Sequence, residues 1–117
     1  MRRWLSLQAT IAKIEAACLE ISMPLEAAKS RLEPVREYIA LSSIWQTPRD
    51  EADDTELCVK VTADIRMYLH DDIYAKVGEF ESRLTAQGLN IVDVSLYAFD
   101  EDRELYEFSI IAENYIF

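Results

Sequence analysis

The sequence is poor in the residues from which most catalytic sites are built. Among its 117 residues there are two glycines, two cysteines and one histidine. Two glycines do not make a glycine-rich phosphate loop, and Cys18 and Cys58 make neither a disulfide framework nor a zinc site. The HExxH and GxSxG motifs and a cysteine–histidine pairing are also absent. We therefore expect no enzyme activity, no catalytic or metal-binding residues and no cofactor.

Long apolar runs and proline are scarce as well. Half of the residues are hydrophobic, which is enough for a core at this length. No apolar run reaches the length of a membrane span, and Lys13 and Glu15 interrupt the apolar start in a way that argues against a signal peptide. We expect any membrane attachment to come from a segment outside this chain.

Basic residues are few after the first third of the chain. The formal net charge is -10, yet residues 1–36 hold six basic and four acidic residues, so the remainder carries -12. Such an acidic body repels phosphates, and we expect no binding to nucleic acid. The charge either keeps the protein soluble or favours a basic protein surface as partner.

Apolar residues in the N-terminal third recur at alternating spacings of four and three, the a/d rhythm of a coiled coil. They are Leu7, Ile11, Ile14, Cys18, Ile21, Leu25, Ala28, Leu32 and Val35. Pro24 interrupts the run because proline removes a backbone donor and crowds the preceding turn. Two interpretations stay open: one kinked helix, or a second helix that begins with Met23 and Pro24 and is capped by Ser22. We divide the chain into an N-terminal helix, residues 1–23, and a domain, residues 24–117.

The rest of the chain reads as two strands, a helix and two more strands. The strands are expected at Glu37–Thr47, Leu57–Leu69, Leu89–Phe99 and Glu104–Phe117. The helix follows His70-Asp71-Asp72, where an aspartate at the N-cap accepts from free backbone amides, and it ends at Gly88. A metal site at His70 is the alternative to capping. We favour capping, because three adjacent residues at a helix start point in different directions.

An internal repeat links the two halves of the chain. Ser30-Arg31-Leu32 matches Ser82-Arg83-Leu84 at an offset of 52 positions, and Val61 matches Phe108 at an offset of 47. The order of elements, αββαββ, is a circular permutation of the ferredoxin-like unit. We therefore predict an α+β fold, a permuted ferredoxin-like sheet preceded by an N-terminal, coiled-coil-like helix. The second and fourth predicted strands should be central, the other two should be edges, and helices should cover one face.

Two surfaces of the predicted sheet are candidates for contact with other proteins. The open face should carry charged and aromatic side chains together, among them Lys60, Arg66 and Glu107; an ordinary solvated face is the equal alternative. The edge strand Leu89–Phe99 is apolar and carries only Asp93 as a charge, so it can pair with another chain.

The stretch from Val59 to Phe117 resembles the periplasmic region of PilO of type IV pili and of the type II secretion protein M. Within it, Ile73–Leu84 and Gly88–Leu96 look like the family's second helix and the strand that follows. The resemblance is a pattern of apolar positions that covers most of the chain, and the layout of a coiled coil before a permuted ferredoxin-like domain is similar too.

This resemblance implies a non-catalytic scaffold on the periplasmic side of the inner membrane. Such a protein would be an assembly component of a pilus or secretion platform that forms a homodimer or pairs with a related assembly protein. The predicted contact residues are the heptad positions Ile11, Ile14, Ile21 and Leu25 and the edge-strand positions Val92, Val94 and Tyr97. The alternative is a small cytoplasmic acidic protein, an inhibitor or immunity-type protein that blocks a basic site on its partner.

Overall fold

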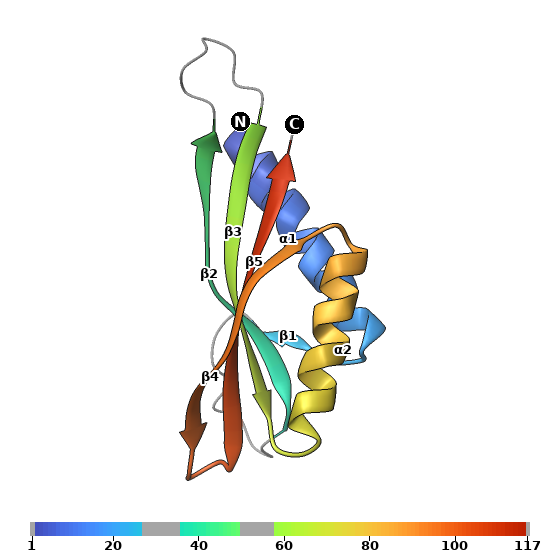
Figure 1. Cartoon of the computed structure of the whole chain (residues 1–117), viewed down its shortest axis with the longest axis vertical. Coiled ribbons are helices and arrows are strands. Elements are labelled where there is room, and N and C mark those ends of the chain that lie inside the picture. The colour runs from blue at the N-terminus through green and yellow to red at the C-terminus, as the bar shows by residue number, and fades with distance from the viewer. Residues whose placement is uncertain (1, 27–35, 50–57, 117) are drawn as a thin grey trace.

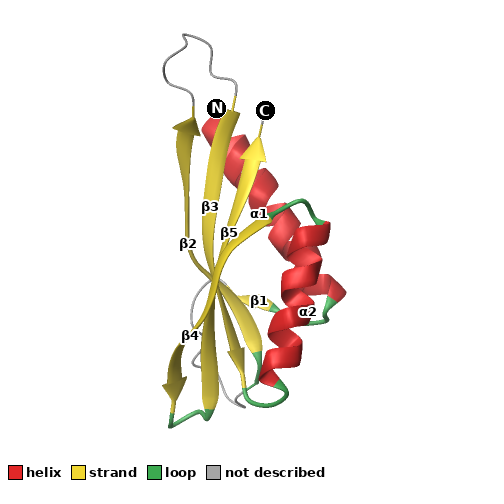
Figure 2. Cartoon of the chain, viewed as in Figure 1, coloured by secondary structure: helices red, strands yellow, loops and turns green. Residues whose placement is uncertain are grey.

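A computed structural model of the chain describes residues 2–26, 36–49 and 58–116. Its elements are α1 (Arg2–Glu20), β1 (Leu25–Glu26), β2 (Tyr38–Arg49), β3 (Cys58–Leu69), α2 (Ile73–Ala86), β4 (Asn90–Asp100) and β5 (Leu105–Ile116). The strands form one sheet in the order β1-β2-β3-β5-β4 (Figures 1 and 2). β1 runs parallel to β2 and every other neighbouring pair is antiparallel. The fold is therefore α+β.

The centre of the sheet is the pair β3 and β5, as predicted. These strands pair from Val59 opposite Ile116 to Leu69 opposite Tyr106. Alternate residues of β3, from Val61 to Leu69, are fully buried in the core beneath the helices, because successive side chains of a strand point to opposite faces. β2 and β4 flank this centre, and β4 is an edge strand as predicted. The prediction that β2 is also an edge is only partly right, because β1 pairs with it at Ile39 and Ala40.

The structure corrects the prediction around Pro24. α1 ends before it, Ser22 has a left-handed φ of 55°, and the Met23 N–H donates to the Cys18 carbonyl at 3.0 Å. This is the long bond of a Schellman C-cap, after which proline is common because it cannot continue a helix. Neither the kinked helix nor a helix beginning at Met23 forms; the chain continues into β1.

α1 lies beside α2 on the sheet (Figure 1). It occupies the place predicted for a helix beginning at Met23 and Pro24. Its apolar stripe packs against the chain's own strands, and Ile14 and Cys18 are buried in the same core as β3. A buried hydrogen bond adds to this contact, since the Asn114 amide of β5 donates to Thr10 Oγ1 at 2.9 Å. The N-terminal helix thus shares one core with the sheet. The rest of the second predicted helix, including Ser30-Arg31-Leu32, lies outside the described residues.

The end of α2 confirms the prediction of a glycine stop. Gly88 has a φ of 91°, a value that costs glycine little because it has no Cβ. The Leu89 N–H donates to the Leu84 carbonyl at 3.1 Å, which is again the long bond of a Schellman cap. This tight stop lets the chain turn directly into the edge strand β4.

Candidate interaction surface

β4 is the most exposed strand of the sheet and the most apolar at the surface. Among the described residues it pairs with β5 alone, so its other edge faces outward. Val92, Leu96, Tyr97 and Phe99 keep 53%, 51%, 62% and 45% of their surface exposed. They are half of the large hydrophobic side chains that stay exposed in the described part of the molecule. Exposed apolar surface gathered on one element is typical of an interaction site.

Two β-bulges interrupt the pairing of β4 with β5. The register shifts between Ile91 and Asp93 and again between Leu96 and Ala98, so Val92 and Tyr97 are the extra residues. A bulge redirects its side chains and bends the strand, and edge strands use bulges to limit pairing with other chains. The longest stretch of β4 with uninterrupted regular pairing is therefore the four residues 93–96, between the two bulges.

Tyr97 is held against the open face of the sheet by Arg66 of β3, whose guanidinium carbon lies 4.1 Å from the centre of the tyrosine ring. Arg66 also donates two hydrogen bonds to Asp64, at 3.0 and 2.9 Å, and one to Glu107 at 2.6 Å. The Ser109 hydroxyl donates to Asp64 at 2.9 Å. One cation thus connects β3, β5 and the bulge of β4.

The ion pairs of this network shift the pKa values of its members. The hydrogen bonds from Arg66, together with the one from Ser109, hold the pKa of Asp64 below its usual range. The hydrogen bond to Asp64 and the contacts with Glu107 raise the pKa of Arg66 further. Burial, followed by the charge of Glu107, raises the pKa of the Tyr68 hydroxyl. Asp64 and Arg66 are therefore both charged at neutral pH, and the side chains of Arg66, Asp64 and Glu107 are mostly shielded from water.

The remainder of the open face is mixed in character, as the sequence predicts. Lys60 pairs with Glu113 at 3.4 Å, and the Tyr115 hydroxyl donates to Glu113 at 2.8 Å. Nearer β2, a small second cluster is buried on this side of the sheet: Tyr38, Ala40, Tyr68 and Leu105. The two tyrosine rings stack with their centres 4.5 Å apart.

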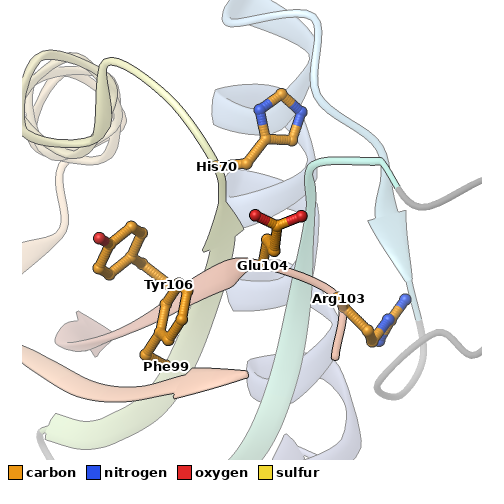
Figure 3. A pocket seen from close by; sticks show the side chains of 5 residues that line it. All are labelled: His70, Phe99, Arg103, Glu104 and Tyr106. Carbon is orange, nitrogen blue, oxygen red and sulfur yellow. The ribbon is translucent and has the colours of Figure 1, made fainter. Parts of the chain in front are cut away.

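A shallow pocket of about 460 Å³ lies beside the end of β4 and is lined by His70, Phe99, Arg103, Glu104 and Tyr106 (Figure 3). The rings of Phe99 and Tyr106 lie together, with centres 4.5 Å apart, while Arg103 is turned away from them. The Arg103 guanidinium instead lies 3.5 Å from the Tyr38 hydroxyl. The pocket therefore lies next to the exposed apolar residues of β4, and both polar and aromatic side chains line it.

The start of α2 is anchored by Glu37, a residue that carries no local sequence signal for this role. Its carboxylate accepts from the His70 backbone N–H at 2.9 Å and from the Asp71 N–H at 3.4 Å. Asp72 occupies the N-cap position with a left-handed φ of 50°, and its side chain makes no cap hydrogen bond. The prediction of an aspartate side-chain cap is therefore wrong. Glu37 instead binds the turn at His70 and Asp71, which leads into the helix.

Glu37, His70 and Asp71 bring three potential metal ligands within 4.8 Å of one another. The Lys76 ammonium already binds this cluster, at 2.7 Å from Glu37 and 2.6 Å from Asp71. Burial alone would raise the pKa of Glu37, but the hydrogen bonds from Lys76 and the two backbone amides hold it below its usual range. A lysine in this place supplies the positive charge that a metal ion would bring, so the cluster is explained as a helix anchor.

Cys18 is a free cysteine that is buried in the core. Burial, helped by the charge of Glu15, raises the pKa of the Cys18 thiol to about 12. A thiol of that kind is protonated and shielded at neutral pH and is therefore a poor nucleophile. The side chain of Cys58 lies outside the described residues.

The predicted contact residues fall into two groups. Ile14 is fully buried in the core, while Ile21, Leu25 and Val94 are partly buried and pack against it; Ile11 is half-buried. Val92 and Tyr97 lie at the surface of β4. The structure adds two residues that the prediction missed, Leu96 and Phe99. Both belong to the same apolar run, and both lie opposite apolar residues of β5, Phe108 and Tyr106.

No family model and no curated protein matches this sequence. Among the described helices, none has the length and apolar character needed to cross a membrane. The feature of the structure that bears most directly on function is the outer edge of β4 with its exposed apolar side chains.

Proposed function

We propose that the chain is a non-catalytic protein-interaction domain that docks a partner along the outer edge of β4. The observation that carries this proposal is the combination of an outward-facing strand edge with four exposed apolar side chains, Val92, Leu96, Tyr97 and Phe99. Unpaired strand edges accept another chain through backbone hydrogen bonds, and the neighbouring side chains supply apolar area to bury.

The Arg66 network supports the proposal because it fixes one of these side chains in advance. Tyr97 is an extra residue in the strand, and the guanidinium at 4.1 Å holds its ring on the open face. An aromatic side chain held in place loses little entropy when a partner covers it. Tyrosines are also over-represented among the residues that dominate binding energy at interfaces.

A narrower proposal gives this domain a place in the inner-membrane platform of a type IV pilus or type II secretion system. It rests on the resemblance of apolar pattern and on the α+β fold. The partner at β4 would then be a second copy or a related assembly protein.

The second candidate is an acidic inhibitor or immunity-type protein that blocks a basic site. The turn between β4 and β5 favours this candidate, since Glu101, Asp102 and Glu104 are all exposed beside the apolar edge. The two candidates differ in the partner and share the same docking edge.

Photo-crosslinking in the source cell tests the shared proposal. A benzoylphenylalanine in place of Leu96 on β4 should form an adduct with one specific protein, identified by mass spectrometry. The matched control is the same substitution at Trp45, a similarly exposed side chain on the opposite side of the sheet, in the part of β2 beyond its two residues paired with β1. Equal adducts from both positions, or no protein adduct from Leu96, would show that β4 is not the docking edge.

A further inference from the structure

We infer that the β4 edge receives an extended partner segment in which apolar residues alternate with lysine or arginine, added to the sheet as a further strand. This inference rests on the proposed function and deepens it, because it names the chemistry of the partner. Three features carry it: the charge around β4, the regular backbone between the bulges, and the exposed apolar side chains on both sides of that backbone.

The charge around β4 is strongly one-sided. Residues 90–104 hold five acidic side chains and a single basic one, Arg103. The guanidinium of Arg103 is directed to Tyr38, while Asp93, Glu101 and Asp102 are exposed. A segment with positive side chains is attracted to this edge at long range, and an acidic segment is repelled.

The backbone between the bulges sets the length of the added strand. Four residues, Asp93 to Leu96, keep regular pairing with β5 and present their other edge outward. Because a strand alternates its donors and acceptors between two sides, about half of these residues offer backbone groups to a partner. Backbone pairing is thus short, and the affinity must come mainly from side chains.

Exposed apolar side chains of β4 lie on both faces of the sheet, although the two open-face residues of this stretch, Asp93 and Ser95, are polar. Leu96 and Phe99 lie next to the helix-covered face, whereas Tyr97 lies on the open face over Arg66. An alternating segment places its apolar residues on one face of the sheet and its basic residues on the other. Such a segment therefore meets both the apolar contacts and the carboxylates of this edge.

A second copy of the chain is a poorer occupant of the same edge. Pairing two β4 strands would bring Asp93 and the acidic turn of each copy to the same interface, where like charges repel. A net charge of -10 on each copy adds to this repulsion. A basic strand from another protein is favoured on the same grounds.

The test uses three fluorescent peptides of about nine residues and the whole chain. The first alternates lysine with valine, the second alternates glutamate with valine, and the third is the lysine peptide with proline at its central position, which removes a backbone donor. Fluorescence anisotropy should show the lysine peptide binding at least about tenfold more tightly than either of the others. Its affinity should fall about tenfold between about 0.05 and 0.5 M NaCl.

Two variants of the chain locate the binding. Leu96→Lys should weaken the lysine peptide at least about tenfold, while Trp45→Lys on the opposite edge should leave its affinity within about twofold. Val92→Lys serves in place of the first variant if circular dichroism shows that Leu96→Lys is unfolded. Asp93→Asn should reduce the salt dependence while the chain stays folded.

Several results overturn the inference: equal binding of the lysine and glutamate peptides, equal binding of the proline peptide, or no binding of the lysine peptide. A stable dimer through β4 in light scattering, lost in Leu96→Lys, would assign the edge to a second copy. The proposed function fails separately, through the absence of a Leu96 crosslink in the cell. If Leu96 forms a crosslink in the cell but the lysine peptide binds no more tightly than the glutamate peptide, then β4 is the docking edge and the inference of a basic partner segment is wrong.

Discussion

Replacing Arg66 with methionine removes the guanidinium that Asp64 and Glu107 share on the open face. The two carboxylate side chains keep only 16% and 14% of their surface exposed. Taking away one partner of a fully buried ion pair costs about 3–5 kcal/mol, because a charge is left without compensation. The residual exposure lowers this cost, and the lost stacking on Tyr97 adds about 0.5–1 kcal/mol. We therefore expect the free energy of unfolding to fall by about 3 kcal/mol at pH 7.

Urea unfolding followed by tryptophan fluorescence measures this difference. Lys60→Met is the matched control, because Lys60 is more exposed and its partner Glu113 keeps a hydrogen bond from Tyr115. That control should lose less than about 1 kcal/mol. A triple variant that also carries Asp64→Asn and Glu107→Gln should regain part of the loss, since no unpaired charge then remains.

The loss in Arg66→Met should also depend on pH. In the wild type the pKa of Asp64 is lowered from its ordinary value of 3.8. Its contribution to stability is therefore present above about pH 4 and disappears as the pH falls through the folded-state pKa. At about pH 3 the difference between wild type and variant should shrink. If Arg66→Met lowers the free energy of unfolding by less than about 1 kcal/mol at pH 7, or by the same amount at both pH values, then Arg66, Asp64 and Glu107 do not form a desolvated network of ion pairs.

Other elements of the fold give three further predictions. Burial raises the pKa of the Cys18 thiol from 9.0 to about 12, so between pH 8 and 10 this thiol ionises only in the unfolded protein. Urea titrations should therefore show the wild type losing about 1.4 kcal/mol more free energy of unfolding over this range than Cys18→Ala, and an equal loss in both proteins would contradict the prediction. Gly78→Ala, whose added Cβ would have no atom within 4 Å, should raise the free energy of unfolding by about 0.5–1 kcal/mol, whereas Gly88→Ala should lower it by about 1–2 kcal/mol because residue 88 has a φ of 91°. Thermal melts in which both variants change stability in the same direction would contradict this prediction. Glu37→Gln should lower the free energy of unfolding by about 1 kcal/mol at pH 7, because the hydrogen bond to Lys76 is weakened. This loss should disappear as the pH falls through the lowered pKa of Glu37, which urea denaturation at about pH 7 and pH 3 measures.

The sheet could be predicted from the sequence because its signals are local. β3 alternates apolar and polar residues over its whole length, so both its existence and its buried face follow from a period of two. The same alternation places Lys60 and Arg66 on the open face. Gly88 marks the end of α2 because the left-handed conformation found there is one that glycine adopts without strain.

The role of α1 could not be predicted because two structures share one pattern. A stripe at spacings of three and four fits a coiled coil with another chain and equally fits a helix packed on its own sheet. Only the tertiary structure shows that Ile14 belongs to the core. Pro24 was ambiguous for a related reason, since the left-handed turn before it is made by Ser22, a residue that gives no signal for that conformation.

The details of the candidate surface were beyond the sequence because they depend on distant residues. Glu37 lies more than thirty positions from the amides it accepts from, so no local rule identifies it as the anchor of α2. The bulges of β4 occur without a glycine, and each shifts the alternation by one residue. The prediction named Val94, which packs against the core, and omitted Leu96, although both lie on the same face of β4.

The claim that β4 is the docking edge is tested most directly by affinity. The partner identified by crosslinking should bind the purified wild-type chain, and Leu96→Lys should weaken that binding at least about thirtyfold, which corresponds to about 2 kcal/mol. Trp45→Lys, on the opposite edge, should leave the affinity within about twofold. If the two variants weaken binding equally, or if Leu96→Lys binds like the wild type, the partner docks elsewhere and the account of this edge is wrong.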